Sequence, residues 1–139
     1  MKKHTDALVA LAETVPNVTA VYVSIAKNAD QSAVTVPYVV IHPADGRDDS
    51  DRLAGPSVTQ YPRFTVLSVG KSPDEAAWIA ERLKAVLIVG GIGVVPIVPG
   101  ERSGTFWYSS PQPIQVDTDA FPPLIWHTAE VGFESTPNS

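Results

Sequence analysis

The side chains best suited to acid–base chemistry in this chain are its three histidines, His4, His42 and His127. Histidine titrates near neutral pH, so it can serve as a general base or as a metal ligand. The three lie far apart along the chain, and none belongs to a paired metal motif or a G-x-S-x-G nucleophile elbow. We therefore expect a surface His4, two strand histidines with polar partners, and no catalytic residue. A small hydrolase using His127 or His42 with an aspartate stays open as an alternative.

A charged segment in the middle of the chain is the next candidate site. It holds four aspartates within seven positions and two interleaved arginines, namely Asp45, Asp48, Asp49, Asp51, Arg47 and Arg52. The spacing is not that of a calcium-binding loop, because Pro56 stands where the bidentate glutamate should be. The arginines also neutralise part of the acidic charge. The segment thus favours a solvated loop, spanning Pro43 to Pro56, that pairs with a partner surface, and we expect neither a metal nor a cofactor.

The run Gly90-Gly91-Ile92-Gly93 could suggest a phosphate-binding loop. Such a loop leads into a helix N-terminus, where free N–H groups point at the anion. Here the glycines follow a predicted helix. That helix begins with Ser72 as N-cap, Pro73 at its first position and Glu75 completing a capping box. The glycines are therefore expected to terminate the helix in the left-handed conformation.

Aromatic residues offer a different kind of surface. Phe106, Trp107 and Tyr108 are consecutive, so in a strand they must point to both faces. A ligand-binding module that stacks its ligand on these rings is one alternative. Trp78 lies on the flank of the second helix, four residues before Arg82. It is expected either to stack on Arg82 or to be buried under a neighbouring subunit, because interfaces favour Trp and Arg.

The overall composition indicates one globular domain. The chain has 139 residues, of which 44% are hydrophobic and 18% charged, with a formal net charge of −5. This charge argues against a general nucleic-acid binder. Disulfides and thiolate metal sites are excluded because there is no cysteine. No apolar run is long enough for a membrane span. We expect a single domain over residues 1–134 and a flexible C-terminal tail over 135–139.

The pattern of apolar residues predicts an α+β fold. A helix over 3–14 ends before Pro16, and β-branched runs at 18–25, 34–42 and 58–69 predict three strands. Pro62 marks an edge or a bulge in the third strand. The order α-β-β-β-α-β-β describes a mixed or antiparallel sheet flanked by two helices. Further strand pieces are expected at 104–109, 113–116 and 124–133, and residues 94–98 are expected to be a short strand or a connector.

This order of elements, together with three stretches of sequence, resembles the tail terminator (tail completion) proteins of long-tailed bacteriophages, of the actinobacterial phage and prophage type. The stretches are Val36-Pro37-Tyr38-Val39-Val40-Ile41, Ser50-Asp51-Arg52-Leu53-Ala54-Gly55 and Pro73-Asp74-Glu75-Ala76-Ala77-Trp78-Ile79-Ala80-Glu81-Arg82-Leu83. The likeness extends from Leu8 to about Phe133. Its motifs are structural, and none is a reaction signature.

The resemblance implies a homo-oligomeric ring, commonly a hexamer, that caps the tail tube, stops its polymerisation and joins the head. Its partners would be the major tail tube protein and a head-completion or connector protein, with DNA passing through the lumen unread. The protein would act in the virion tail after assembly in the host cytoplasm. A head–tail connector or minor tail subunit is the nearest alternative.

A ring of identical copies needs two unlike surfaces on each subunit. The charged segment, with Arg47, Asp48, Asp51 and Arg52, is the first candidate interface. The helix flank at Trp78 and Arg82 is the second.

Overall fold

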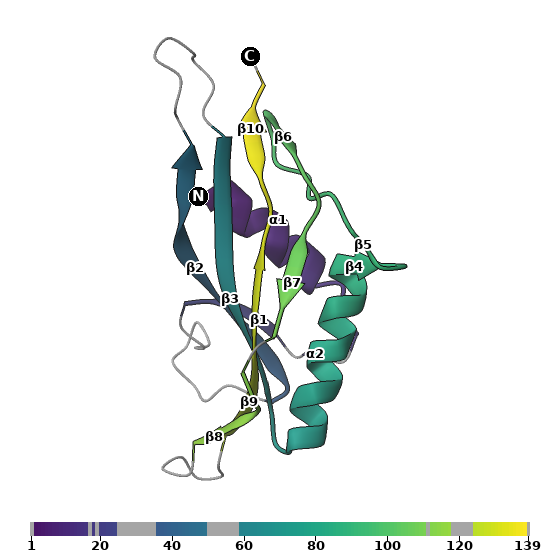
Figure 1. The fold of residues 1–139 in the computed structure, drawn as a ribbon. Helices are drawn as coiled ribbons and strands as arrows, with labels where there is room; N and C mark the ends of the chain where they lie inside the picture. The colour runs from purple at the N-terminus through teal and green to yellow at the C-terminus, as the bar shows by residue number, and fades with distance from the viewer. Residues whose placement is uncertain are drawn as a thin grey trace.

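A computed structural model describes residues 2–16, 18, 20–24, 36–49, 59–110, 112–117 and 124–138. Two helices lie on one side of a mixed sheet (Figure 1). The elements are α1 (Lys2–Ala12), β1 (Ala20–Val23), β2 (Tyr38–Asp49), β3 (Thr59–Gly70), α2 (Pro73–Leu87), β4 (Ile88–Val89), β5 (Ile92–Gly93), β6 (Glu101–Ser103), β7 (Trp107–Ser109), β8 (Gln115–Asp117), β9 (Leu124–Gly132) and β10 (Ser135–Pro137). The predicted α+β class is confirmed. No helix in the described ranges has both the length and the apolarity that crossing a membrane requires.

The long strand β3 is the centre of the sheet. It pairs antiparallel with β2 on one side and with β9 on the other, and β10 continues the same side beyond the end of β9. β1 runs parallel to β2 at one edge. β7 and β8 pair with β9, and β6 pairs with β10, all antiparallel. Strands from both ends of the chain therefore meet around one central strand.

The core lies between the sheet and the helices. Side chains alternate along a strand, so Val39, Ile41, Phe64, Val66 and Val131 share the face that α1 and α2 cover. The helices contribute apolar stripes at helical spacing: Leu8 and Ala12 from α1, and Ile79, Leu83 and Leu87 from α2. Each aliphatic side chain of this size stabilises the fold by roughly 1.5–3 kcal/mol when fully buried.

The alternate residues of the same strands form a second, smaller cluster on the opposite face. Tyr38, Val40 and Val69 are its buried members. Tyr22, Val36, Leu67, Leu124 and Trp126 pack around them and are only partly buried. The two faces of the sheet therefore differ, because the described helices cover one face only (Figure 1).

The start of α2 confirms the capping prediction. Ser72 Oγ accepts a hydrogen bond from the Glu75 backbone N–H at 3.1 Å. The Glu75 carboxylate accepts one in return from the Lys71 N–H at 2.9 Å, one residue before the N-cap itself. Two free N–H groups are satisfied in this way, so the helix begins at Pro73.

The prediction of a loop from Pro43 to Pro56 is wrong over its first half, because β2 continues to Asp49. The ladder with β3 satisfies the backbone here and outweighs the low strand propensity of aspartate. The register shifts between Ala44 and Arg47 of β2, opposite Pro62. The prediction of an irregularity at Pro62 is therefore right in place, but the extra residue belongs to β2 and not to β3. Asp51 and Arg52 lie outside the described residues.

Gly90 and Gly91 do not terminate the helix directly. α2 ends at Leu87, and the chain then enters a hairpin in which Ile88–Val89 pairs with Ile92–Gly93. The two glycines form its turn with φ of 61° and 80°. Positive φ at both central residues is the geometry of a two-residue hairpin turn, and glycine adopts it without strain.

The C-terminal boundary also differs from the prediction. Ser135–Pro137 form β10, and Ser135 is fully buried, so a flexible tail from residue 135 is wrong for these three residues. Their partner β6 was not predicted, because Glu-Arg-Ser carries no apolar alternation. Residues 94–98 form a connector with no strand assignment.

Candidate functional site

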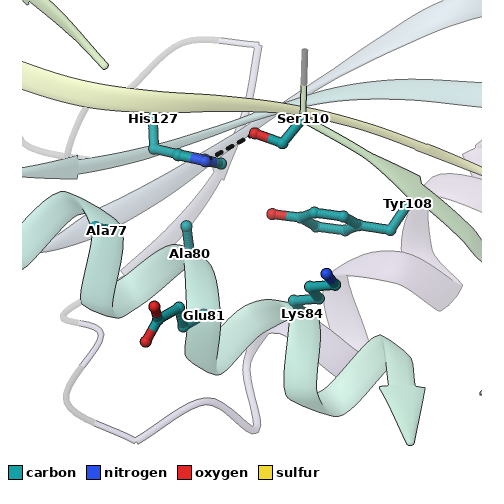
Figure 2. Close-up of a pocket in the computed structure, with 7 residues that line it drawn as sticks. All are labelled: Ala77, Ala80, Glu81, Lys84, Tyr108, Ser110 and His127. Atoms are coloured by element: carbon teal, nitrogen blue, oxygen red, sulfur yellow. Dashed lines mark hydrogen bonds between the residues drawn. The ribbon is translucent and has the colours of Figure 1, made fainter. Parts of the chain in front are cut away.

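A small cleft lies between α2 and the strands β7 and β9 (Figure 2). We call it the Ser–His cleft. It measures about 220 Å³ and is lined by Ala77, Ala80, Glu81, Lys84, Tyr108, Ser110 and His127. Alanines on this face of α2 leave room beside the sheet, and the pairing of β7 with β9 brings Ser110 to His127. The sequence offered no local signal for this pair, since its members are 17 residues apart.

Ser110 Oγ and His127 Nε2 are 2.8 Å apart. A serine activated by histidine also needs a carboxylate on the other ring nitrogen to orient the imidazole. That nitrogen, Nδ1, is buried and has no hydrogen-bond partner among the described residues. Ser110 Oγ also lies 3.2 Å from the Thr128 carbonyl, to which it can donate. The pair therefore has the first contact of a nucleophilic site, but the part of the chain that the structure describes supplies no orienting group.

Burial shapes the titration of this cleft. It lowers the pKa of His127, so the imidazole is neutral at neutral pH. Burial also raises the pKa of the Tyr108 hydroxyl. The Lys84 ammonium lies over the Tyr108 ring, 5.3 Å from its centroid, which is a cation–π contact. The cleft can thus accept a proton at His127 only under acidic conditions.

A buried polar cluster, which we call the Glu101 cluster, joins α1 to the β6–β10 edge. The Glu101 side chain is 2% exposed, forms an ion pair with Lys3 and is hydrogen-bonded to His4 Nε2 at 2.9 Å. It also accepts a hydrogen bond from Ser135 Oγ at 2.6 Å. Burial by itself raises the pKa of Glu101, but the hydrogen bonds from Lys3, Ser135 and His4 outweigh it and lower the pKa to about 2.

The expectation of a surface His4 is wrong, because the residue is buried in this cluster. His4 and its partner Glu101 are 97 residues apart, so nothing local reveals the contact. His42 lies on the helix-free face of the sheet, whereas His127 faces α2. The three histidines are therefore not brought together, and the described residues contain no group of three potential metal ligands.

The predicted interface residues lie in separate parts of the molecule. Arg47 and Asp48 are on β2, paired with Tyr61 and Gln60 of β3. On α2, the Arg82 guanidinium lies 5.1 Å from the centroid of the Trp78 ring. Trp78 is also partly buried against the core. Stacking within the subunit, one of the two alternatives for Trp78, is thus observed.

Of the three consecutive aromatics, Phe106 and Tyr108 point to the core side and Trp107 points away from it, the alternation of an extended chain. Phe106 is buried in the core, Trp107 is exposed, and Tyr108 lines the Ser–His cleft. Together they form no common stacking surface.

An exposed apolar strip follows α2 and was not among the predicted interface residues. Its members are Val89, Ile92, Val95 and Ile97, with 60%, 69%, 51% and 88% of their surface exposed. The sequence does contain a signal for this strip, because residues 85–100 contain no charged or polar side chain. The hairpin that carries Val89 and Ile92 projects beyond the C-terminal end of α2 (Figure 1).

A second apolar feature is a hollow on the helix-free face of the sheet, which we call the sheet hollow. It measures about 240 Å³. Tyr38, Val40, Leu67, Val69, Leu124 and Trp126 line it together with Ser24 and His42. None of these residues is a lysine, arginine, aspartate or glutamate.

Comparison with known proteins identifies a similar fold among solved structures. No family model matches the sequence, and no curated protein matches it. The fold is similar to that of a chain in the solved structure described as the virion of a native gene transfer agent (GTA) particle, with a TM-score of 0.56 and 16% sequence identity. The likeness covers 95% of this chain and 84% of that chain. At this identity it shows that the two chains share a fold.

Proposed function

We propose that this protein is a structural subunit of a phage-type virion, and specifically a tail terminator. The observation that carries the proposal is the shared fold, over 95% of the chain, with a component of a gene transfer agent virion. The order of elements and the sequence stretches that resemble tail terminators point to the same class.

In this proposal identical copies close into a ring, commonly of six, on the end of the tail tube. The ring stops polymerisation of the major tail tube protein and offers its other side to a head-completion or connector protein. Its activity is assembly, and no bond is made or broken. A head-to-tail contact between two unlike surfaces closes into a ring when the rotation between neighbours divides a full turn.

DNA would pass through the lumen without sequence-specific contact. The net charge of −5 fits this role, because like charge discourages binding of the phosphate backbone. The segment with Arg47, Asp48, Asp51 and Arg52 is proposed to contribute to contacts in the ring, together with the flank of α2.

The mass of the protein in solution tests this proposal. Size-exclusion chromatography with light scattering, with and without the major tail tube protein, is expected to give a closed oligomer of several copies. A strict monomer at high concentration, even with the tube protein present, would contradict it. A closed oligomer that binds only head proteins would favour the alternative, a head–tail connector.

Trp78→Ala tests the helix flank. If neighbouring subunits bury Trp78, this change weakens assembly more than it lowers the melting temperature of the subunit. Leu83→Ala is the matched core control on the same helix, because Leu83 is fully buried and its truncation is expected to cost about 2–5 kcal/mol of folding free energy. A large loss of Tm in Trp78→Ala with unchanged assembly would place the tryptophan in the core only.

The contact between Ser110 and His127 favours a second candidate, a small hydrolase. Because His127 Nδ1 has no carboxylate partner among the described residues, we expect no turnover of an activated ester such as p-nitrophenyl acetate above the background rate. Catalysed hydrolysis that disappears in Ser110→Ala and persists in Ser109→Ala would establish the hydrolase instead.

A further inference from the structure

The apolar strip is unusual for a protein that remains a monomer. Monomeric proteins expose single apolar side chains commonly, but a contiguous exposed patch marks a site of interaction. Here four β-branched residues within nine positions are each at least half exposed. No charged side chain interrupts residues 85–100.

The local structure holds the strip outward. Val89 and Ile92 are direct cross-strand partners in the β4–β5 hairpin. In the following segment Pro96 and Val98 are buried whereas Val95 and Ile97 are exposed, the alternation of an extended chain. Gly93 lies so close to the Phe106 backbone that a side chain there would collide with it. The strip is thus fixed on the core at its inner residues.

The sheet hollow has matching chemistry on the opposite face. The strip is anchored to the helix-covered core through Ile88, Val94 and Val98, whereas the hollow belongs to the cluster on the helix-free face. Neither surface contains a lysine, arginine, aspartate or glutamate, so bringing them together takes none of these charged groups out of water. The hollow, at about 240 Å³, exceeds the roughly 150 Å³ of a cavity that accepts benzene, so it can take an aliphatic side chain.

We infer that the apolar strip of one copy docks into the sheet hollow of the next copy, and that this contact builds the ring. The inference rests on the proposed function and assigns surfaces to it. Because strip and hollow lie on opposite faces of the sheet, each subunit uses one surface for each neighbour. The contact is therefore head-to-tail, as a ring requires, and not a symmetric dimer. A nucleic acid is a poor occupant, since the strip offers no cation to a phosphate.

Two lysine substitutions separate the surfaces. Ile97→Lys places a charge on the strip at a side chain that is 88% exposed, so folding is spared. Leu124→Lys places a charge in the hollow at a side chain that is only partly buried, so the cost to folding is limited. Val116→Lys is the matched control, because Val116 is also half exposed but belongs to neither surface. Far-UV circular dichroism and the melting temperature verify that each variant folds.

Sedimentation or light scattering of the full chain then measures assembly. We expect Ile97→Lys and Leu124→Lys each to weaken subunit association by about a hundredfold, and Val116→Lys to leave it unchanged. Mixing the two defective variants gives the sharpest result. The Leu124→Lys variant keeps an intact strip and the Ile97→Lys variant keeps an intact hollow. The two variants are therefore expected to form a 1:1 heterodimer that cannot bind a further copy.

The outcomes that overturn the inference differ from those that overturn the function. If the wild-type protein never assembles, both the proposed function and the proposed contact between copies are refuted. A wild-type ring that both lysine variants still form leaves the function intact and refutes these surfaces. A ring unaffected by Ile97→Lys that loses binding to the tail tube protein would assign the strip to that partner, which also refutes a contact between copies.

Discussion

Two neighbouring segments of this chain reverse the usual pattern of burial. Glu101 is charged, yet its side chain is only 2% exposed. Four residues earlier, Ile97 is apolar and 88% exposed. The buried carboxylate is compensated within the subunit by Lys3, His4 and Ser135. The apolar strip turns its side chains to solvent, and burying them requires a second molecule.

The difference shows how to separate features that hold the subunit together from features that act between molecules. A buried ion pair whose partners all belong to the same subunit holds α1 against the β6–β10 edge. Its loss should therefore lower the free energy of unfolding. An exposed apolar surface contributes little to the stability of the subunit, so its loss should instead lower the affinity between subunits. The predictions below test this division.

The largest effect is expected from Glu101→Gln. Removing the charge leaves the Lys3 ammonium without its anion and weakens the hydrogen bonds from His4 and Ser135, and losing the charge of a buried ion pair is destabilising. We expect the free energy of unfolding to fall by about 2–4 kcal/mol, measured by urea denaturation. Glu130→Gln is the control, because the Glu130 pair with Arg63 is exposed and worth at most about 1 kcal/mol. Equal losses in the two variants would contradict the structural role of the Glu101 cluster.

Acidification should produce part of the same loss. Folding lowers the pKa of Glu101 from 4.5 to about 2, so the unfolded chain binds the proton more readily. The contribution of the ionised carboxylate is therefore complete above pH 4.5 and is lost as the pH falls from 4.5 towards 2. Urea denaturation of the wild type and of Glu101→Gln should give stabilities that converge over this range. A gap that stays constant with pH would show that the ionised form is not what stabilises the fold.

The smallest effect on folding is expected from Ile92→Ser in the apolar strip. Ile92 is 69% exposed, so the free energy of unfolding should change by no more than about 0.5 kcal/mol. Association should nevertheless weaken, which analytical ultracentrifugation would measure. A clear loss of stability with unchanged association would assign the hairpin to the subunit fold and remove the contrast with Glu101.

Local signals in the sequence predicted local structure well. Ser72, Pro73 and Glu75 identified the start of α2, because a helix cap depends on residues within one turn. Pro62 likewise marked the irregularity in the β2–β3 ladder, although the extra residue lies on β2, opposite the proline.

Features that depend on distant partners were missed. β2 runs through an aspartate-rich segment because β3 pairs with it, and β10 exists because β6 lies beside it. The burial of His4 depends on Glu101, far along the chain. The pair of Ser110 and His127 likewise depends on strand register. The apolar strip was detectable as an uncharged run, but only the structure shows which of its residues face outward.

The most direct test of the account is the mass of the wild-type protein by light scattering across a range of concentrations. We expect a single closed species of several copies, commonly six, which Ile97→Lys converts to monomer and Val116→Lys does not. A monomer at every concentration, with or without the tail tube protein, would contradict it.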